Sequence, residues 1–213
     1  MAITDADKLG IYNGALVEIL GSRALASLTE AREPRRVLDQ IWASGGIVNY
    51  ALERGDWNFA TRTVRLGVDT DVTPAFGYDA AFTRPTDLVR LTSIARSPDS
   101  RSPMLASEYA DESGWWHANG TTLYVKYVSN DTDYGFESSR WTESFTDYLK
   151  ALMAFRGGKR IASPSAMRDA KQLMDLALKT ARSDDAMAEG VKMLPSGSWS
   201  QSRGSSGSRY GGE

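Results

Sequence analysis

The hydrophobic residues of this 213-residue chain change their period twice. Apolar positions recur every three or four residues over 4–55 and again after 138, which predicts amphipathic helices in both segments. Between them, short stretches alternate between apolar and polar residues and are separated by Pro, Gly, Asp and Ser, as in strands joined by turns. A helical bundle with an inserted β subdomain is the simplest packing of this order.

We therefore expect an α+β fold that is mainly helical. An antiparallel bundle of two N-terminal and two C-terminal helices should carry a small antiparallel β subdomain and an extended C-terminal tail. The expected boundaries are 1–56 and 138–190 for the discontinuous bundle, 57–137 for the β subdomain and 191–213 for the arm. Serine and glycine dominate this arm, so its apolar surface should be too small to offset the entropy of ordering it.

Local signals place the N-terminal helices. Thr4 with Asp7 three residues later is typical of a capping box at a helix start. A second helix is expected over 34–55, because its first residue is proline, which suits the first helical turn. Gly45-Gly46 disfavours helix there, so either the helix breaks or another backbone packs closely against it.

The C-terminal helices are expected over 138–156, ended by Gly157-Gly158, and over 163–181. Their large side chains, with those near residues 42 and 57, should form the core rather than a ligand site. These aromatic residues are Trp42, Trp57, Phe59, Trp141, Phe145 and Tyr148.

In the middle block, Asn119-Gly120 is typical of the two-residue type I′ turn of a hairpin, here joining 115–118 to 121–128. Leu123, Val125 and Tyr127 would share one face of the second strand. The other candidate strands cover 62–68, 76–83, 88–95 and 104–109.

Composition excludes several functions. Lys+Arg 25 against Asp+Glu 27 gives a net charge of −2, which argues against a dedicated nucleic-acid-binding protein. No apolar stretch approaches the ~20 residues of a membrane span, and we expect no secretion signal. Cysteine is absent, which removes disulfides and thiolate sites, and the single histidine, His117, cannot build a multi-His metal site in one chain. We expect no metal and no cofactor.

One cluster has enzyme-like chemistry. Glu108, Asp111 and Glu112 precede Trp115 and Trp116, and paired carboxylates beside aromatic rings are what glycoside hydrolysis uses. The spacing is not specific, so a polar loop leading into an edge strand is the favoured interpretation. A glycan-cleaving enzyme that uses Glu108 with Asp111 or Glu112 is the main alternative, and a sugar-binding module that uses the two tryptophans is a third.

Two other motifs are weaker. His117 could belong to a Ser-His-Asp site, but the chain has no G-x-S-x-G nucleophile elbow. Gly157-Gly158-Lys159 lacks the full spacing of a phosphate loop and follows a helix rather than a strand. It is better interpreted as a helix end with basic residues at the negative end of the helix dipole.

Two segments could bind a partner. A basic run at the end of the third helix is either a solvated face or, in a ring-shaped oligomer, a lining around DNA. It comprises Arg156, Lys159 and Arg160. The Ser/Gly-rich tail is either an unstructured end or a binding arm, since arginine and aromatic residues commonly anchor such contacts. Its candidate anchors are Trp199, Arg203, Arg209 and Tyr210.

An ordered set of short phrases spans about 9–180. They are Tyr12-Asn13-x-Ala15-Leu16, Leu20-Gly21, Trp57-Asn58-Phe59-Ala60, Pro74-Ala75-Phe76-Gly77-Tyr78, Ala81-Phe82, Pro85-Thr86-Asp87-Leu88-Val89-Arg90 and the helix over 145–152. Together they resemble the head–tail adaptor (connector) proteins of tailed bacteriophages, the family that includes tail tubular protein A of short-tailed phages. The chain departs from the family at Gly45-Gly46, where a continuous helix would be expected.

The resemblance implies a non-enzymatic structural virion protein with antiparallel helices and a β insertion. It implies a ring, commonly a dodecamer, seated under the portal at the head–tail junction after assembly in the host cytoplasm. The implied partners are the portal protein, further copies of this chain, a downstream tail nozzle or tail-tube protein, and viral DNA passing without sequence specificity, with no membrane involved. The arm over 191–213 would reach the portal, and Asp87 and Arg90 would tie the β insert to the bundle through a local polar pair.

Overall fold

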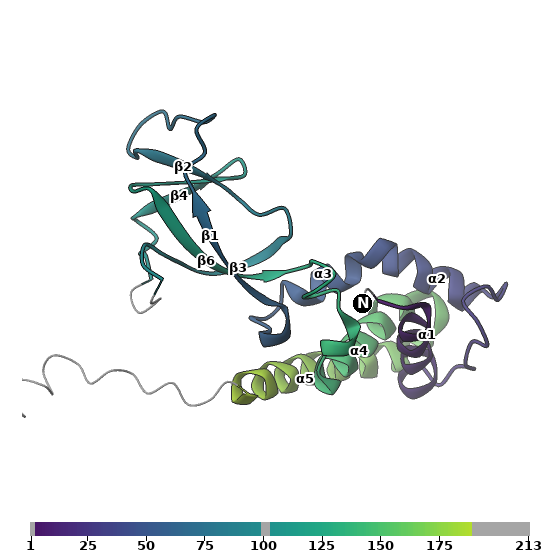
Figure 1. The fold of residues 1–213 in the computed structure, drawn as a ribbon. Coiled ribbons are helices and arrows are strands. Elements are labelled where there is room, and N and C mark those ends of the chain that lie inside the picture. The colour runs from purple at the N-terminus through teal and green to yellow at the C-terminus, as the bar shows by residue number, and fades with distance from the viewer. Residues whose placement is uncertain (1–2, 99–102, 189–213) are drawn as a thin grey trace, which may run out of the picture.

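The computed structural model describes residues 3–98 and 103–188, which form a mixed α+β fold with a helical part and a β part (Figure 1). In the described residues no helix is both long enough and apolar enough to cross a membrane. The helical part contains α1 (Asp5–Asn13), the π-helical turn η1 (Gly14–Ile19), α2 (Glu33–Trp42), the 3₁₀ turn η2 (Ala43–Gly45), α3 (Gly46–Leu52), α4 (Glu143–Ile161) and α5 (Pro164–Ala188).

The helical part is built around α4, which contacts α1, η1, α2, α3 and α5. Phe145 is fully buried on α4, and its ring centroid lies 4.9 Å from those of Trp57 and Phe59 and 5.4 Å from that of Trp141. The edge-on contacts to Trp57 and Phe59 join residues that are far apart in the chain. The aromatic residues expected in the core therefore lie in it or pack against it.

Local signals explain where the first helices begin and break. The predicted capping box is confirmed, because the Thr4 hydroxyl accepts from the Asp7 amide while the Asp7 carboxylate accepts from the Thr4 amide. The predicted conflict at Gly45-Gly46 is resolved as a break between α2 and α3. Gly45 has a φ of +86°, and a Cβ at this position would lie 3.1 Å from the Phe136 ring.

The glycine pair in α4 behaves differently from the prediction. Gly157 and Gly158 do not end the helix, which continues to Ile161. Both are buried, and a Cβ on them would lie 3.3 Å from Leu38 and 3.5 Å from Met167 respectively. The missing side chains let α2 and α5 approach α4 closely, which outweighs the low helix propensity of glycine.

The β part consists of two three-stranded antiparallel sheets, ordered β1-β6-β3 and β2-β5-β4. Phe82, Trp116, Leu123, Val125 and Tyr127 are fully buried in its core, so the predicted inward face of the last strand is confirmed. The strands are β1 (Thr61–Gly67), β2 (Ala80–Thr83), β3 (Leu88–Ala95), β4 (Tyr109–Glu112), β5 (Trp115–Ala118) and β6 (Thr122–Ser129).

The predicted hairpin at Asn119-Gly120 is wrong. β5 pairs with β2 and β4, whereas β6 pairs with β1 and β3, so the dipeptide links the two sheets. Asn119 instead accepts a hydrogen bond from the Asp79 amide at 3.0 Å. The two-residue hairpin turn is Ser113-Gly114, where both φ angles are positive (48° and 96°), between β4 and β5. Of the strand predicted over 104–109, only Tyr109 lies in a strand, the start of β4, and the first part of the strand predicted over 76–83 is not a strand.

Candidate functional site at the junction of the two parts

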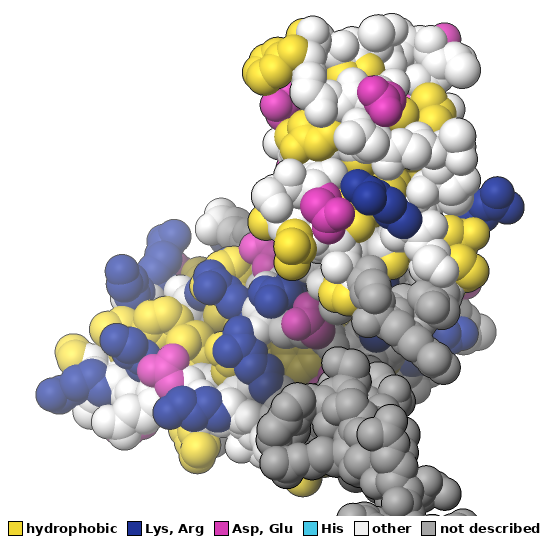
Figure 2. Space-filling view, turned by 90° about the vertical axis from the view of Figure 1, so that its left-hand side faces the viewer, with side chains coloured by type: hydrophobic (Ala, Val, Ile, Leu, Met, Phe, Trp, Pro, Cys, Tyr) yellow, Lys and Arg dark blue, Asp and Glu magenta, His cyan; other side chains and the backbone are white. Residues whose placement is uncertain are grey.

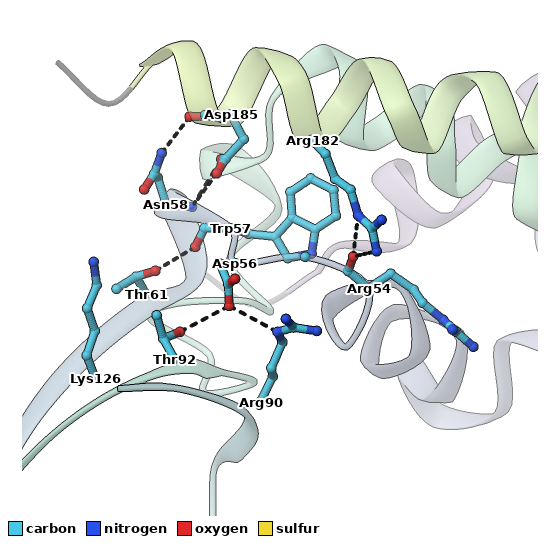
Figure 3. A pocket seen from close by; sticks show the side chains of 12 residues that line it. Arg54, Asp56, Trp57, Asn58, Thr61, Arg90, Thr92, Lys126, Arg182 and Asp185 are labelled. Carbon is cyan, nitrogen blue, oxygen red and sulfur yellow. Dashed lines mark hydrogen bonds and ion pairs between the residues drawn. The ribbon is translucent and has the colours of Figure 1, made fainter. Parts of the chain in front are cut away.

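A hollow of about 510 Å³ lies where the helical part meets the β part (Figure 3). It is bordered by the segment that follows α3, by β1, β3 and β6, and by the last turns of α5. The charged and polar side chains around it are Arg54, Asp56, Asn58, Thr61, Arg90, Thr92, Lys126, Arg182 and Asp185, with Trp57 at its wall.

Asp185 fixes the entry of the chain into β1. Its side chain is buried at 7% exposure, and its two carboxylate oxygens accept from the Asn58 amide at 3.0 and 3.1 Å. The Asn58 side-chain amide in turn donates to the Asp185 carbonyl at 2.7 Å. Trp57, directly before Asn58 in the chain, is fully buried and donates its indole N–H to the Ala51 carbonyl at 3.1 Å. The last turn of α5 therefore holds, through these hydrogen bonds, the segment that leads into β1.

Arg90 and Arg182 add further ties. Arg90 on β3 pairs through Nε with Asp56 at 3.0 Å and donates to the Glu53 carbonyl at 3.2 Å. The Arg182 guanidinium donates to the Arg54 carbonyl. These contacts attach the segment after α3 to β3 on one side and to α5 on the other; Figure 3 shows the bonds from Arg90 to Asp56 and from Arg182 to Arg54 as dashed lines.

The polar contacts at the junction hold the helical part and the β part to each other. The hollow is bordered by the cations Arg54, Arg90, Lys126 and Arg182 and by the carboxylates of Asp56 and Asp185. In their described contacts, these two carboxylates accept hydrogen bonds from other groups of the protein. In the part of the chain that the structure describes, no group of three or more His, Asp or Glu side chains is arranged to hold a metal ion. The geometry supports a fixed angle between the two parts.

The expected polar pair of Asp87 and Arg90 is wrong in its partners, because each residue binds elsewhere. Asp87 stays within the β part, where its carboxylate accepts from Arg62 at 2.8 Å and from the hydroxyls of Tyr127 and Ser129. Partial burial by itself raises the pKa of Asp87, but these donors outweigh it and hold that pKa below its ordinary value. Of these two residues, only Arg90 ties the insert to the helical part.

The residues of the enzyme-like cluster separate into two groups. Glu108, Glu112 and His117 border a second hollow of about 450 Å³ on the β part, together with Phe76 and Tyr78. Asp111 lies outside that lining and pairs with Arg84 at 3.0 Å, and Glu108 lies 3.6 Å from Arg96. Trp116 is fully buried and so cannot serve as a platform, whereas Trp115 is half-buried and donates to Asp69 at 3.1 Å. Pro85 lies in the turn before β3, where its carbonyl accepts from the Leu88 amide.

The basic run also divides. Arg156 lies over the Tyr50 ring, 4.1 Å from its centroid, and Arg160 pairs with Glu33 at 3.2 Å, whereas Lys159 is exposed. Figure 2 shows that Lys and Arg side chains gather over the helical part. The candidate arm anchors Trp199, Arg203, Arg209 and Tyr210 lie outside the described residues.

Sequence reasoning missed Asp185 as the partner of Asn58. The two residues are 127 positions apart, so no local spacing connects them. One signal was present: Asp185 follows the buried Ala181 by four residues and so falls on the inward stripe of α5. A carboxylate at such a position needs a donor.

No known protein family matches this chain, and no curated protein matches it in sequence.

Proposed function

We propose that the protein is a structural head–tail adaptor of a tailed bacteriophage, which joins two virion components by binding rather than by catalysis. The observation that carries this proposal is that each part of the molecule exposes large apolar side chains. On the β part, Phe76 is 87% and Leu105 68% exposed; on α5, Leu173 and Leu176 are 45% and 61% exposed. Apolar surface left open to water is typical of protein contact sites.

The junction supports the same proposal. A protein that joins two partners has to fix their relative positions, and the ties made by Asp185, Arg90 and Arg182 couple the two apolar surfaces. In this proposal the helical part corresponds to the antiparallel bundle of the adaptor family, over 1–56 and 138–190. The β part over 57–137 is its insertion, and 191–213 is the portal-binding arm.

The adaptor would form a ring below the portal protein, with twelve copies as in the family, and hold a nozzle or tail-tube protein below. Viral DNA would pass through the ring without being read. Lys159 and Arg160, with the exposed cations Arg168, Lys171 and Lys179 of α5, would supply non-specific phosphate contacts along its path.

The test is the mass of the purified chain mixed with its cognate portal protein, measured by light scattering after gel filtration. We expect a complex with many copies per portal. Deleting 196–213 should leave the circular dichroism spectrum of the folded domain intact and abolish the complex, because the arm anchors would be lost. A full-length chain that does not bind the portal would contradict the proposal, and a truncated chain that still binds would remove the arm from it.

A second candidate, a glycan-cleaving tail protein, is favoured by one observation. Glu108 and Glu112 border the same hollow as Phe76 and Tyr78, which combines carboxylates with rings that could stack on a sugar. This arrangement selects Glu112 over Asp111 as the partner of Glu108. Turnover of peptidoglycan should then be lost in Glu108→Gln and kept in Asp111→Asn, and a wild-type protein without turnover would exclude this candidate.

A further inference from the structure

A groove of about 320 Å³ runs between η1, α4 and α5. Ile19, Leu173, Leu176 and Ala177 give it an apolar lining. Val17, two residues before Ile19 in η1, is also exposed. Leu173 and Leu176 are both open to water, so this groove is an apolar surface of the helical part.

The rim of the groove carries an excess of negative charge. Lys150 lies 3.0 Å from Asp147 and 3.8 Å from Glu18, so a single ammonium group faces two carboxylates. Both carboxylates are largely exposed, whereas Lys150 is mostly covered. Burial by itself lowers the pKa of Lys150, but Asp147, Glu18 and Glu143 together raise it. A partner on this groove should therefore present cations beside apolar or aromatic groups.

The opposite side of the α4–α5 pair presents such a surface. Tyr50 is half-buried, and two guanidinium groups lie close to its ring, that of Arg54 at 4.3 Å and that of Arg156 at 4.1 Å from the ring centroid. Arg182 joins them by its bond to the Arg54 carbonyl. Arg182 and Leu176 are six residues apart on α5, a spacing that at 3.6 residues per turn places them on different sides of the helix.

We propose that these two surfaces bind each other between copies of this chain. The Tyr50, Arg54 and Arg156 surface of one copy seats on the groove of the next, where its guanidinium groups face Glu18 and Asp147 and its ring packs on Leu173 and Leu176. Arginine suits this role because it pairs with carboxylates and stacks on rings. The contact uses two different surfaces, so it is heterologous and repeats from copy to copy. Only the closure of that repeat into a ring rests on the proposed function. Arg156 then belongs to the contact between copies and not to the DNA path.

The test uses the full chain and two variants, sized by light scattering. Leu176→Asp introduces a charge into the groove, and Arg156→Glu reverses the charge of the facing surface; both residues are exposed, so the fold should survive, as circular dichroism would check. The wild type should form oligomers and each variant alone should have the mass of one chain. An equal mixture of the two variants should form dimers and nothing larger, because only one intact pair of surfaces remains. Val68→Asp, at an exposed valine on the β part that belongs to neither surface, is the control and should keep the oligomer.

Three results would overturn the inference: a wild type that stays monomeric, variants that still form oligomers, or a mixture that stays monomeric. These results can be told apart from a failure of the adaptor function. If both variants still form a ring that binds the portal, the proposed function stands and the proposed contact surfaces are wrong. If the mixture forms dimers but the wild type does not bind the portal, the proposed contact surfaces stand and the proposed function is wrong.

Discussion

The two parts of the molecule are held together by different kinds of contact. The helical part has a broad apolar core in which Phe145 meets the aromatic rings of Trp57, Phe59 and Trp141. The β part has a smaller core around Trp116 and Phe82, and beside it a charged network centred on Asp87. The helical part should therefore be the more sensitive to lost volume. Both parts should lose some stability in acid, because the pKa is lowered for Asp7 and Asp39 in the helical part and for Asp87 in the β part. A loss of stability in one part should affect the other part only while the contacts at the junction remain formed.

Phe145→Ala should have the largest effect. It removes the ring that joins Trp57, Phe59 and Trp141, and truncating such a buried aromatic side chain costs about 4 kcal/mol of unfolding free energy. Urea denaturation followed by tryptophan fluorescence would measure it. Phe155→Ala, on the same helix but only partly buried, should cost less, and equal losses would show that burial in this core does not set the scale.

Asp185→Ala should loosen the junction while leaving both cores formed. The half-buried amide of Asn58 would lose its acceptor, which costs about 2 kcal/mol. Hydrogen exchange at the Asn58 amide should speed up, and small-angle scattering should show a broader range of distances between the parts. The exposed neighbour provides the control, since Asp184→Ala should leave both measurements unchanged. Unaltered hydrogen-exchange protection of the Asn58 amide in Asp185→Ala would argue against a role of Asp185 in holding the two parts together.

Asp87→Asn should weaken the β part by about 1.5 kcal/mol near neutral pH, because the charge-assisted bond to Arg62 is lost. The pKa of Asp87 in the folded protein lies below the ordinary 3.8, so its stabilisation is complete above that value and is lost as the pH falls through the folded pKa. The stability difference between wild type and variant should therefore shrink below about pH 4. Asp133→Asn, at an exposed position, serves as the control, and a difference that stays constant in acid would refute the ionic account.

The smallest expected effect comes from a pair of neighbouring glycines. Gly45→Ala forces a side chain into a left-handed conformation against Phe136 and should cost about 1 kcal/mol. Gly46→Ala meets only ordinary contact, with a nearest atom at 3.9 Å, and should be neutral or stabilising by about 0.5 kcal/mol. Thermal melting of both variants measures the difference, and equal melting temperatures would show that the break between α2 and α3 does not depend on Gly45.

Features decided within a few residues could be predicted from the sequence. The capping box at Thr4 and Asp7 and the break at Gly45 follow from local hydrogen bonds and backbone sterics. Features that depend on a distant partner could not. Asn119-Gly120 and Ser113-Gly114 both suit tight turns, but only strand pairing decides which of them joins neighbouring strands.

The candidate site follows the same rule. Asp185 and Asn58 meet because α5 returns along α4 to the start of the sheet, and no spacing in the sequence records this. Gly157-Gly158 is the converse case, since the local signal for a helix end was overridden by the close packing of α2 and α5. The position of Phe76 and Tyr78 beside Glu108 likewise depends on how two loops of the β part come together.

The central place of α4 and β6 has a consequence for the order in which the chain folds during synthesis. β1 and β3 do not pair with each other; both wait for β6, which is the last of the described strands to be made. The first helices likewise wait for α4, which begins only at Glu143. On the ribosome, more than half of the chain must therefore emerge before either core can close. The nascent protein would spend that interval with unpaired strands and open apolar faces, a state in which chaperones commonly assist.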